Sequence, residues 1–138
     1  MVSKHKLIIN IFTHPYINKK LWIFKANIDW SKTEVEIDKD DDNYIEWKNG
    51  IWHNGIWFDG KWEHGKGRNG VWYDGIWITG IWYNGTWKNG RWNNGFWKSG
   101  NWEGGYWING CIYNPKTNKY KLSKLPPNKC KWSLSYGK

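Results

Sequence analysis

The hydrophobic and polar positions of the chain follow a five-residue period over residues 46–110. The unit consists of a variable residue, Trp, a second variable residue, Asn or Asp, and Gly, and it recurs thirteen times without an insertion. Gly closes all thirteen units, Asn or Asp precedes it in nine, and Trp occupies the second position in twelve. Only Gly67 interrupts the tryptophans. Such strict periodicity indicates a repeat architecture in which each unit buries one side against its neighbours.

A period of five predicts an all-β array. In a helix of 3.6 residues per turn, Trp at every fifth position would point in all directions and form no apolar face. Each glycine inside a helix also lowers its stability by about 1 kcal/mol. Asn-Gly and Asp-Gly favour turns because both residues tolerate positive φ. The pattern therefore predicts short strands with a turn every five residues.

Two geometries satisfy this prediction. A narrow antiparallel β-ribbon with three-residue turns sends alternate tryptophans to opposite faces, where most of them contact water. In a β-solenoid, each pentad forms one side of a coil, and a Gly and the Trp two residues later, such as Gly50 and Trp52, both point inward. We prefer the β-solenoid over the ribbon.

The spacing of a small residue two places before a large apolar one resembles the pentapeptide-repeat family, with Gly in the small position and Trp in place of Leu or Phe. This resemblance implies a four-sided, right-handed β-helix. With four pentads per coil, tryptophans twenty residues apart stack on one another. We therefore expect two buried columns, which are Trp52 with Trp72 and Trp92, and Trp57 with Trp77 and Trp97.

Caps are expected on both sides of the array, since the end coils of a solenoid otherwise expose a strand edge and part of the core. Residues 1–45 are predicted to form an N-terminal β cap, with strands at 5–12, 20–30 and 33–37. Residues 111–138 are predicted to form a C-terminal cap, with a hairpin around a Pro-Lys-Thr-Asn turn and a closing strand at 131–136. This cap is basic, because it holds seven Lys and no Asp or Glu.

The array followed by an Ile-Tyr-Asn-Pro-Lys-Thr segment resembles the Trp/Gly-rich pentad-repeat proteins encoded by tailed phages. The resemblance spans residues 46–138 and implies a phage setting, but it supplies no catalytic residue. One further stretch, residues 58–67, is similar to part of a MORN repeat, with its aromatic-x-Gly-x-Trp and His-Gly-x-Gly pieces.

Two groups of residues are candidate binding sites. The side chains that flank Trp in the middle pentads are apolar or aromatic, whereas those of residues 86–103 are mostly polar. An exposed apolar patch usually marks an interface, so we predict a partner-binding surface made of Val71, Tyr73, Ile76, Ile78, Ile81 and Tyr83. At Gly67 the missing Trp is expected to leave a notch, where backbone amides together with His64, Lys66 and Arg68 form a candidate anion site.

Several classes of function are not supported by the sequence. The four histidines are scattered, no nucleophile or acid–base motif is present, and no Cys/His spacing suits zinc, so we expect no enzyme, no metal and no cofactor. No stretch has the length of a membrane span or the form of a signal peptide. We therefore expect no membrane contact and a place in the host cytoplasm or the virion. Cys111 and Cys130 are either two reduced thiols or one bridge.

Three non-catalytic functions remain. The leading one is a structural or adaptor protein, in a phage virion, whose rigid array docks protein partners or a second copy. The first alternative is a glycan-binding module that uses exposed Trp and Tyr as stacking platforms, which requires tryptophans on the surface. The second is sequence-independent nucleic-acid binding by Lys and aromatic side chains, favoured by the net charge of +9.

Overall fold

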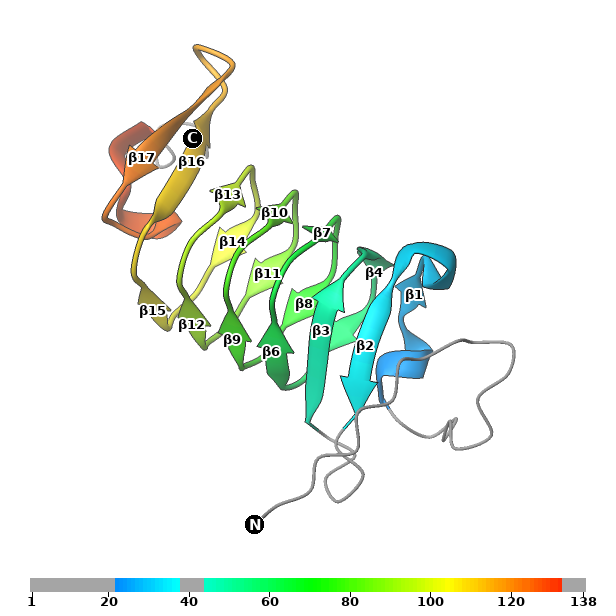
Figure 1. Ribbon diagram of the computed structural model, residues 1–138. Helices are drawn as coiled ribbons and strands as arrows, with labels where there is room; N and C mark the ends of the chain where they lie inside the picture. Colours follow the sequence, from blue (N-terminus) through cyan, green and yellow to red (C-terminus); the bar gives the residue numbers. More distant parts are fainter. Residues whose placement is uncertain (1–21, 38–43, 133–138) are drawn as a thin grey trace.

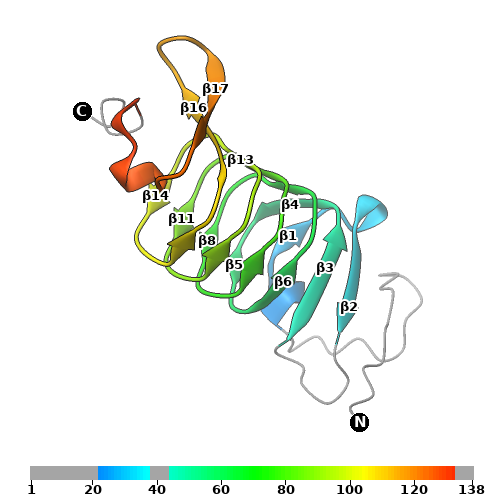
Figure 2. The same ribbon diagram turned by 60° about the vertical axis from the view of Figure 1, so that its left-hand side comes forward.

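The protein is an all-β solenoid. The computed structural model describes residues 22–37 and 44–132. Each pentad supplies one short strand, and three parallel ladders of strands run along the axis of the coil (Figures 1 and 2). The β-solenoid prediction is confirmed, and the antiparallel ribbon is wrong.

The three ladders define three faces, which we name by their number of strands. The seven-stranded face contains, in spatial order, β1 (Asn27–Ile28), β4 (Ile51–Asn54), β7 (Lys66–Gly67), β10 (Ile81–Trp82), β13 (Phe96–Trp97), β16 (Gly110–Asn114) and β17 (Lys119–Ser123). The four-stranded face contains β14 (Asn101–Trp102), β11 (Thr86–Trp87), β8 (Val71–Trp72) and β5 (Ile56–Trp57). The six-stranded face contains β15 (Tyr106–Trp107), β12 (Arg91–Trp92), β9 (Ile76–Trp77), β6 (Gly60–Trp62), β3 (Ile45–Asn49) and β2 (Glu34–Ile37).

A coil contains three pentads, not four. Trp77 pairs with Trp62 on one side and with Trp92 on the other, so the repeat along the axis is fifteen residues. The prediction that tryptophans twenty residues apart stack is therefore wrong. In the first coil Trp47, Trp52 and Trp57 close a triangle of edge-to-face contacts, with ring centroids 5.9, 5.9 and 6.4 Å apart. Three indoles already fill the cross-section, because Trp is larger than the Leu or Phe of the family on which the four-sided prediction rested.

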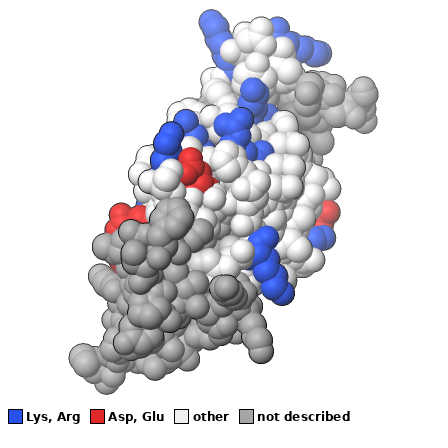
Figure 3. All heavy atoms as spheres, turned by 90° about the vertical axis from the view of Figure 1, so that its right-hand side faces the viewer, with Lys and Arg blue, Asp and Glu red and all other residues white. Residues whose placement is uncertain are grey.

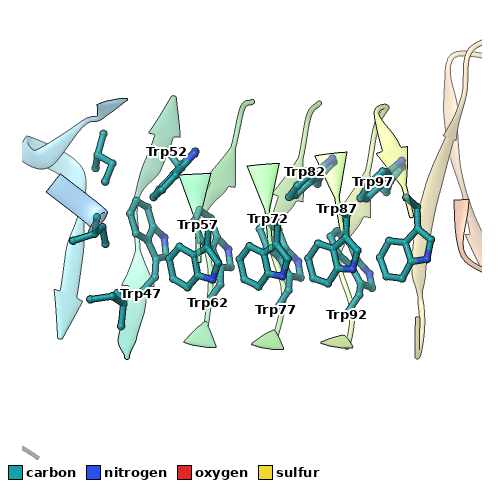
Figure 4. Close-up of a cluster of buried hydrophobic side chains, with 14 of the residues drawn as sticks. Trp47, Trp52, Trp57, Trp62, Trp72, Trp77, Trp82, Trp87, Trp92 and Trp97 are labelled. Carbon is teal, nitrogen blue, oxygen red and sulfur yellow. The ribbon is translucent and has the colours of Figure 1, made fainter. Parts of the chain in front are cut away.

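The core consists of three columns of stacked indoles (Figure 4). Neighbours within a column lie 4.4–5.0 Å apart and nearly parallel, as in the pairs Trp47–Trp62 and Trp87–Trp102. The twelve array tryptophans are all at most 8% exposed. The predicted burial is therefore confirmed for Trp52, Trp57, Trp72, Trp77, Trp92 and Trp97.

The glycines form the corners between faces, where the chain turns with positive φ. Gly85, for example, has a φ of +121°, and a Cβ there would overlap the carbonyl oxygen of Gly70 in the preceding coil. The side chain of the residue before the Gly stabilises several corners. At one of them, Asn49 Oδ1 accepts a hydrogen bond of 2.9 Å from Gly50 N. The expectation that Gly points into the core is thus wrong. Gly is required by the turn and by the close stacking of corners.

On each side of the solenoid, two backbone hydrogen bonds connect a coil to the previous one. On the four-stranded face, Val71 N donates to Gly55 O at 2.9 Å and Tyr73 N donates to Trp57 O at 2.8 Å. The same pair of bonds recurs around the array with lengths of 2.7–2.9 Å. This continuous ladder, together with the stacked indoles, makes the array a stiff rod.

The N-terminal cap is antiparallel to the array. β1 pairs with β4 and β2 pairs with β3, which covers two of the three strand edges of the first coil. The predicted strand at 33–37 is confirmed as β2. The predicted strand at 20–30 is interrupted by the 3-10 helices Trp22–Lys25 and Trp30–Lys32, and β1 is the one strand within its described part, residues 22–30. The predicted strand at 5–12 lies outside the described residues.

The C-terminal cap begins with the predicted hairpin, formed by β16 and β17. Ile112 lies above Trp97 and continues its column without an aromatic ring. The chain then forms the 3-10 helix Pro127–Lys129, and Trp132 Nε1 donates to Ile112 O at 3.1 Å. Cys111 and Cys130 are free thiols. Residues 133–136 of the predicted closing strand lie outside the part of the chain that is described.

Candidate functional site

The six residues of the predicted partner-binding surface do not form one patch. Residues 71–85 make up one complete coil, so consecutive pentads face three different directions. Val71 and Tyr73 lie on the four-stranded face, Ile76 and Ile78 on the six-stranded face, and Ile81 and Tyr83 on the seven-stranded face. Only Tyr73 is well exposed, and the other five are half-buried.

The four-stranded face carries a different apolar surface, which we call the apolar strip and define as Ile56, Phe58, Val71 and Tyr73. Ile56, Phe58 and Tyr73 are 41%, 45% and 41% exposed, although each is large and apolar or aromatic. The rings of Phe58 and Tyr73 stack at 5.3 Å with an angle of 6°. Sequence reasoning missed Ile56 and Phe58 because it compared neighbouring pentads, whereas residues share a face at a spacing of fifteen.

The seven-stranded face combines cations with aromatic rings. Arg68 lies over the ring of Tyr83 at 5.3 Å, and Lys98 lies over the ring of Tyr113 at 5.5 Å. The strands of this face also contribute Lys66, Phe96, Lys119, Tyr120 and Lys121. None of its seven strands contains Asp or Glu. The side of the molecule seen in Figure 3 likewise shows more Lys and Arg than Asp and Glu.

The predicted anion site is only partly assembled. His64 and Lys66 line one open pocket, which also includes Lys32 from the N-terminal cap, but Arg68 lies elsewhere, over Tyr83. The backbone amides proposed to hold the anion are already used, because Lys66 N donates to Gly50 O and Arg68 N to Trp52 O. The pocket therefore offers side-chain cations without a ring of free amides.

Acidic groups gather at the N-terminal end of the six-stranded face. Lys48 Nζ lies 2.7 Å from Glu63, 3.4 Å from Glu46 and 3.6 Å from Glu36. The hydrogen bond to Glu63, assisted by the other carboxylates, holds the pKa of Lys48 above its ordinary value despite opposing desolvation. A raised lysine pKa stabilises the fold throughout the neutral range, and this contribution is lost only at strongly alkaline pH. The cluster is thus a structural network that fastens β2 and β3 to the array.

The missing tryptophan at Gly67 leaves a gap in the core that is lined mainly by indoles. Trp52 and Trp82 belong to the same column, and no ring lies between them (Figure 4). The gap is lined by the indoles Trp52, Trp57, Trp62, Trp72, Trp77 and Trp82, and by Asn69, Gly70, Val71 and Asn84. His64, Lys66 and Arg68 are not among its walls, which corrects the prediction that they surround the space left by the indole.

Other kinds of site find little support in the described chain. In residues 22–37 and 44–132, no group of three His, Cys, Asp or Glu side chains is arranged to hold a metal ion. No helix within these same ranges is long and apolar enough to cross a membrane. The array tryptophans that the glycan hypothesis requires on the surface are buried, so that premise is wrong.

Comparisons with known proteins identify no relative. No protein-family model, curated protein or solved structure matches the chain.

Proposed function

We propose that the protein is a non-catalytic structural or adaptor protein that docks a protein partner through the apolar strip. The observation that carries this proposal is the exposure of Ile56, Phe58 and Tyr73 on the neighbouring strands of one face. A contiguous exposed apolar surface on a soluble protein usually marks an interface. Aromatic side chains are also enriched where interfaces are most deeply buried.

The rod geometry supports the same function. Outward side chains are anchored to strands whose inner neighbours are stacked tryptophans, so a partner would meet a surface that loses little conformational entropy on binding. The resemblance to Trp/Gly-rich proteins of tailed phages favours a virion component as the partner. Under this proposal the protein is located in the virion or in the host cytoplasm before assembly.

The double substitution Ile56→Glu with Tyr73→Glu is expected to abolish docking without unfolding the chain, because it places two charges in the interface and leaves the core unchanged. The measurement is the amount of the protein in purified particles of a phage that encodes it, with circular dichroism to verify the fold. Sedimentation velocity on the free protein tests whether the partner is instead a second copy.

A matched control is Thr86→Glu with Asn101→Glu, which introduces the same charge on the same face but outside the apolar strip. The control is expected to enter particles normally. Equal incorporation of both variants, or absence of the parent protein from the particles without self-association, would refute docking through the strip.

The seven-stranded face favours a second function, which is sequence-independent binding of single-stranded nucleic acid. Its strands lack acidic residues, and cations alternate with aromatic rings along the axis, as in Arg68, Tyr83, Lys98 and Tyr113. Proteins that bind single strands without sequence preference use this combination of phosphate-binding cations and stacking rings.

Lys98→Glu is expected to weaken binding of a labelled oligothymidylate and to lower the salt slope of log K by about 1, as for the loss of one phosphate contact. Arg91→Glu makes the same charge change at an exposed position of the six-stranded face and serves as the control. Fluorescence anisotropy over a series of salt concentrations gives both quantities. Identical slopes for the two variants would argue against binding at the seven-stranded face.

A further inference from the structure

The gap at Gly67 lies where one of the three columns lacks an indole. In the same column, Trp82 and Trp97 lie 4.9 Å apart with ring planes 6° from parallel. Trp52 and Trp82 are separated by two coils, with Gly67 in the coil between them. The distance between their ring planes is therefore about twice the ordinary stacking distance, which leaves room for one flat ring.

The walls of this gap suit an aromatic guest. Six indoles surround it, so its walls are mostly aromatic. An unfilled space of this kind costs the surrounding rings the dispersion contacts that a neighbour would provide. Apolar spaces lined by large side chains in protein cores can accept small aromatic molecules.

Few polar groups line the gap. The side chains of Asn69 and Asn84 belong to its lining and offer amide donors and acceptors. Elsewhere in the array, Trp47 Nε1 donates to His64 O, seventeen residues later, at 3.0 Å. That bond does not recur along the array, because seven other array indoles, Trp82 among them, have a buried ring N–H without a hydrogen-bond partner.

We propose that the Gly67 gap is a binding site for a planar, indole-sized aromatic ring system, stacked between Trp52 and Trp82. The ring comes either from a free small molecule or from the tryptophan side chain of another polypeptide. The site shares only Val71 with the apolar strip and includes none of the cations of the seven-stranded face, and it does not depend on either docking function.

The backbone at Gly67 permits a direct test. Unlike the corner glycines, Gly67 lies within β7 and is not among the glycines with positive φ. A Cβ at this position would come no closer than 3.5 Å to another atom, the nearest being on Trp77. A side chain can therefore be introduced here without backbone strain, and Gly67→Trp would complete the column from within.

The probe is 5-fluoroindole, because its fluorine resonance is observed without interference from the tryptophans of the protein. We expect saturable binding to the parent, seen as a shifted or broadened resonance, together with a higher melting temperature in the presence of indole. A parallel titration with N-acetyl-tryptophanamide distinguishes the sources: binding of both indicates a tryptophan side chain as a suitable guest, and binding of indole alone indicates a free molecule.

Gly67→Trp is expected to melt at a higher temperature than the parent and to bind 5-fluoroindole at least about tenfold more weakly. Gly67→Leu fills the gap only in part and is also expected to weaken binding of 5-fluoroindole. This variant tests the proposal if Gly67→Trp does not fold. No binding to the parent at millimolar probe would overturn the proposal. Unchanged affinity in a folded Gly67→Trp or Gly67→Leu variant would overturn it as well.

Discussion

Gly85→Ala is expected to destabilise the protein by about 4 kcal/mol or more, which approaches the whole stability of a small domain. Two effects add. A non-glycine residue is strained at the φ of +121°, and its Cβ would overlap the carbonyl oxygen of Gly70. Relief of this overlap requires one coil to move away from the next, which breaks the hydrogen bond from Thr86 N to Gly70 O. Urea unfolding followed by circular dichroism measures the loss.

The same substitution at Gly67 is the matched control. Gly67→Ala adds a methyl group at ordinary van der Waals distance from Trp77, without a positive φ. It is expected to change the free energy of unfolding by less than about 1 kcal/mol. Similar unfolding midpoints for the two alanine variants would show that the corners do not require glycine.

Trp92→Ala is expected to cost about 3–5 kcal/mol, as for other large-to-small changes of a fully buried aromatic residue. Trp92 is 0% exposed. It stacks between Trp77 at 4.9 Å and Trp107 at 5.0 Å, and it meets Trp87 and Trp97 edge to face, each at 5.8 Å. Removal of one indole thus empties a place with four aromatic neighbours, and differential scanning calorimetry should show a large fall in melting temperature.

Tyr106→Ala provides the comparison, because Tyr106 precedes Trp107 in the same strand but is 74% exposed. Loss of its ring should alter the free energy of unfolding by less than about 0.5 kcal/mol. If Trp92→Ala melted within a degree or two of the parent, the stacked columns would not be the source of stability.

The position of the candidate site depends on the number of sides per coil, which the pentad pattern does not contain. The pentad repeat predicts that the chain turns every five residues, but the number of sides per coil decides which outward residues become neighbours. With three sides, Ile56 and Phe58 come to lie beside Val71 and Tyr73, whereas Ile76 and Ile81 point away from them. The predicted patch was wrong for this reason alone, since the apolar character of its side chains was identified correctly.

The sequence by itself determined that the array is β-structured and that Gly and Asn or Asp mark the turns, and it favoured Trp as the inward residue. These features are local, because they follow from the backbone preferences of Gly and Asn and from the cost of exposing indoles. Only the tertiary structure decided the fifteen-residue coil, since that depends on how many indoles fill one cross-section. It also decided that Gly67 lies between Trp52 and Trp82. The neighbours of a missing ring can be named only once it is known which tryptophans stack on one another.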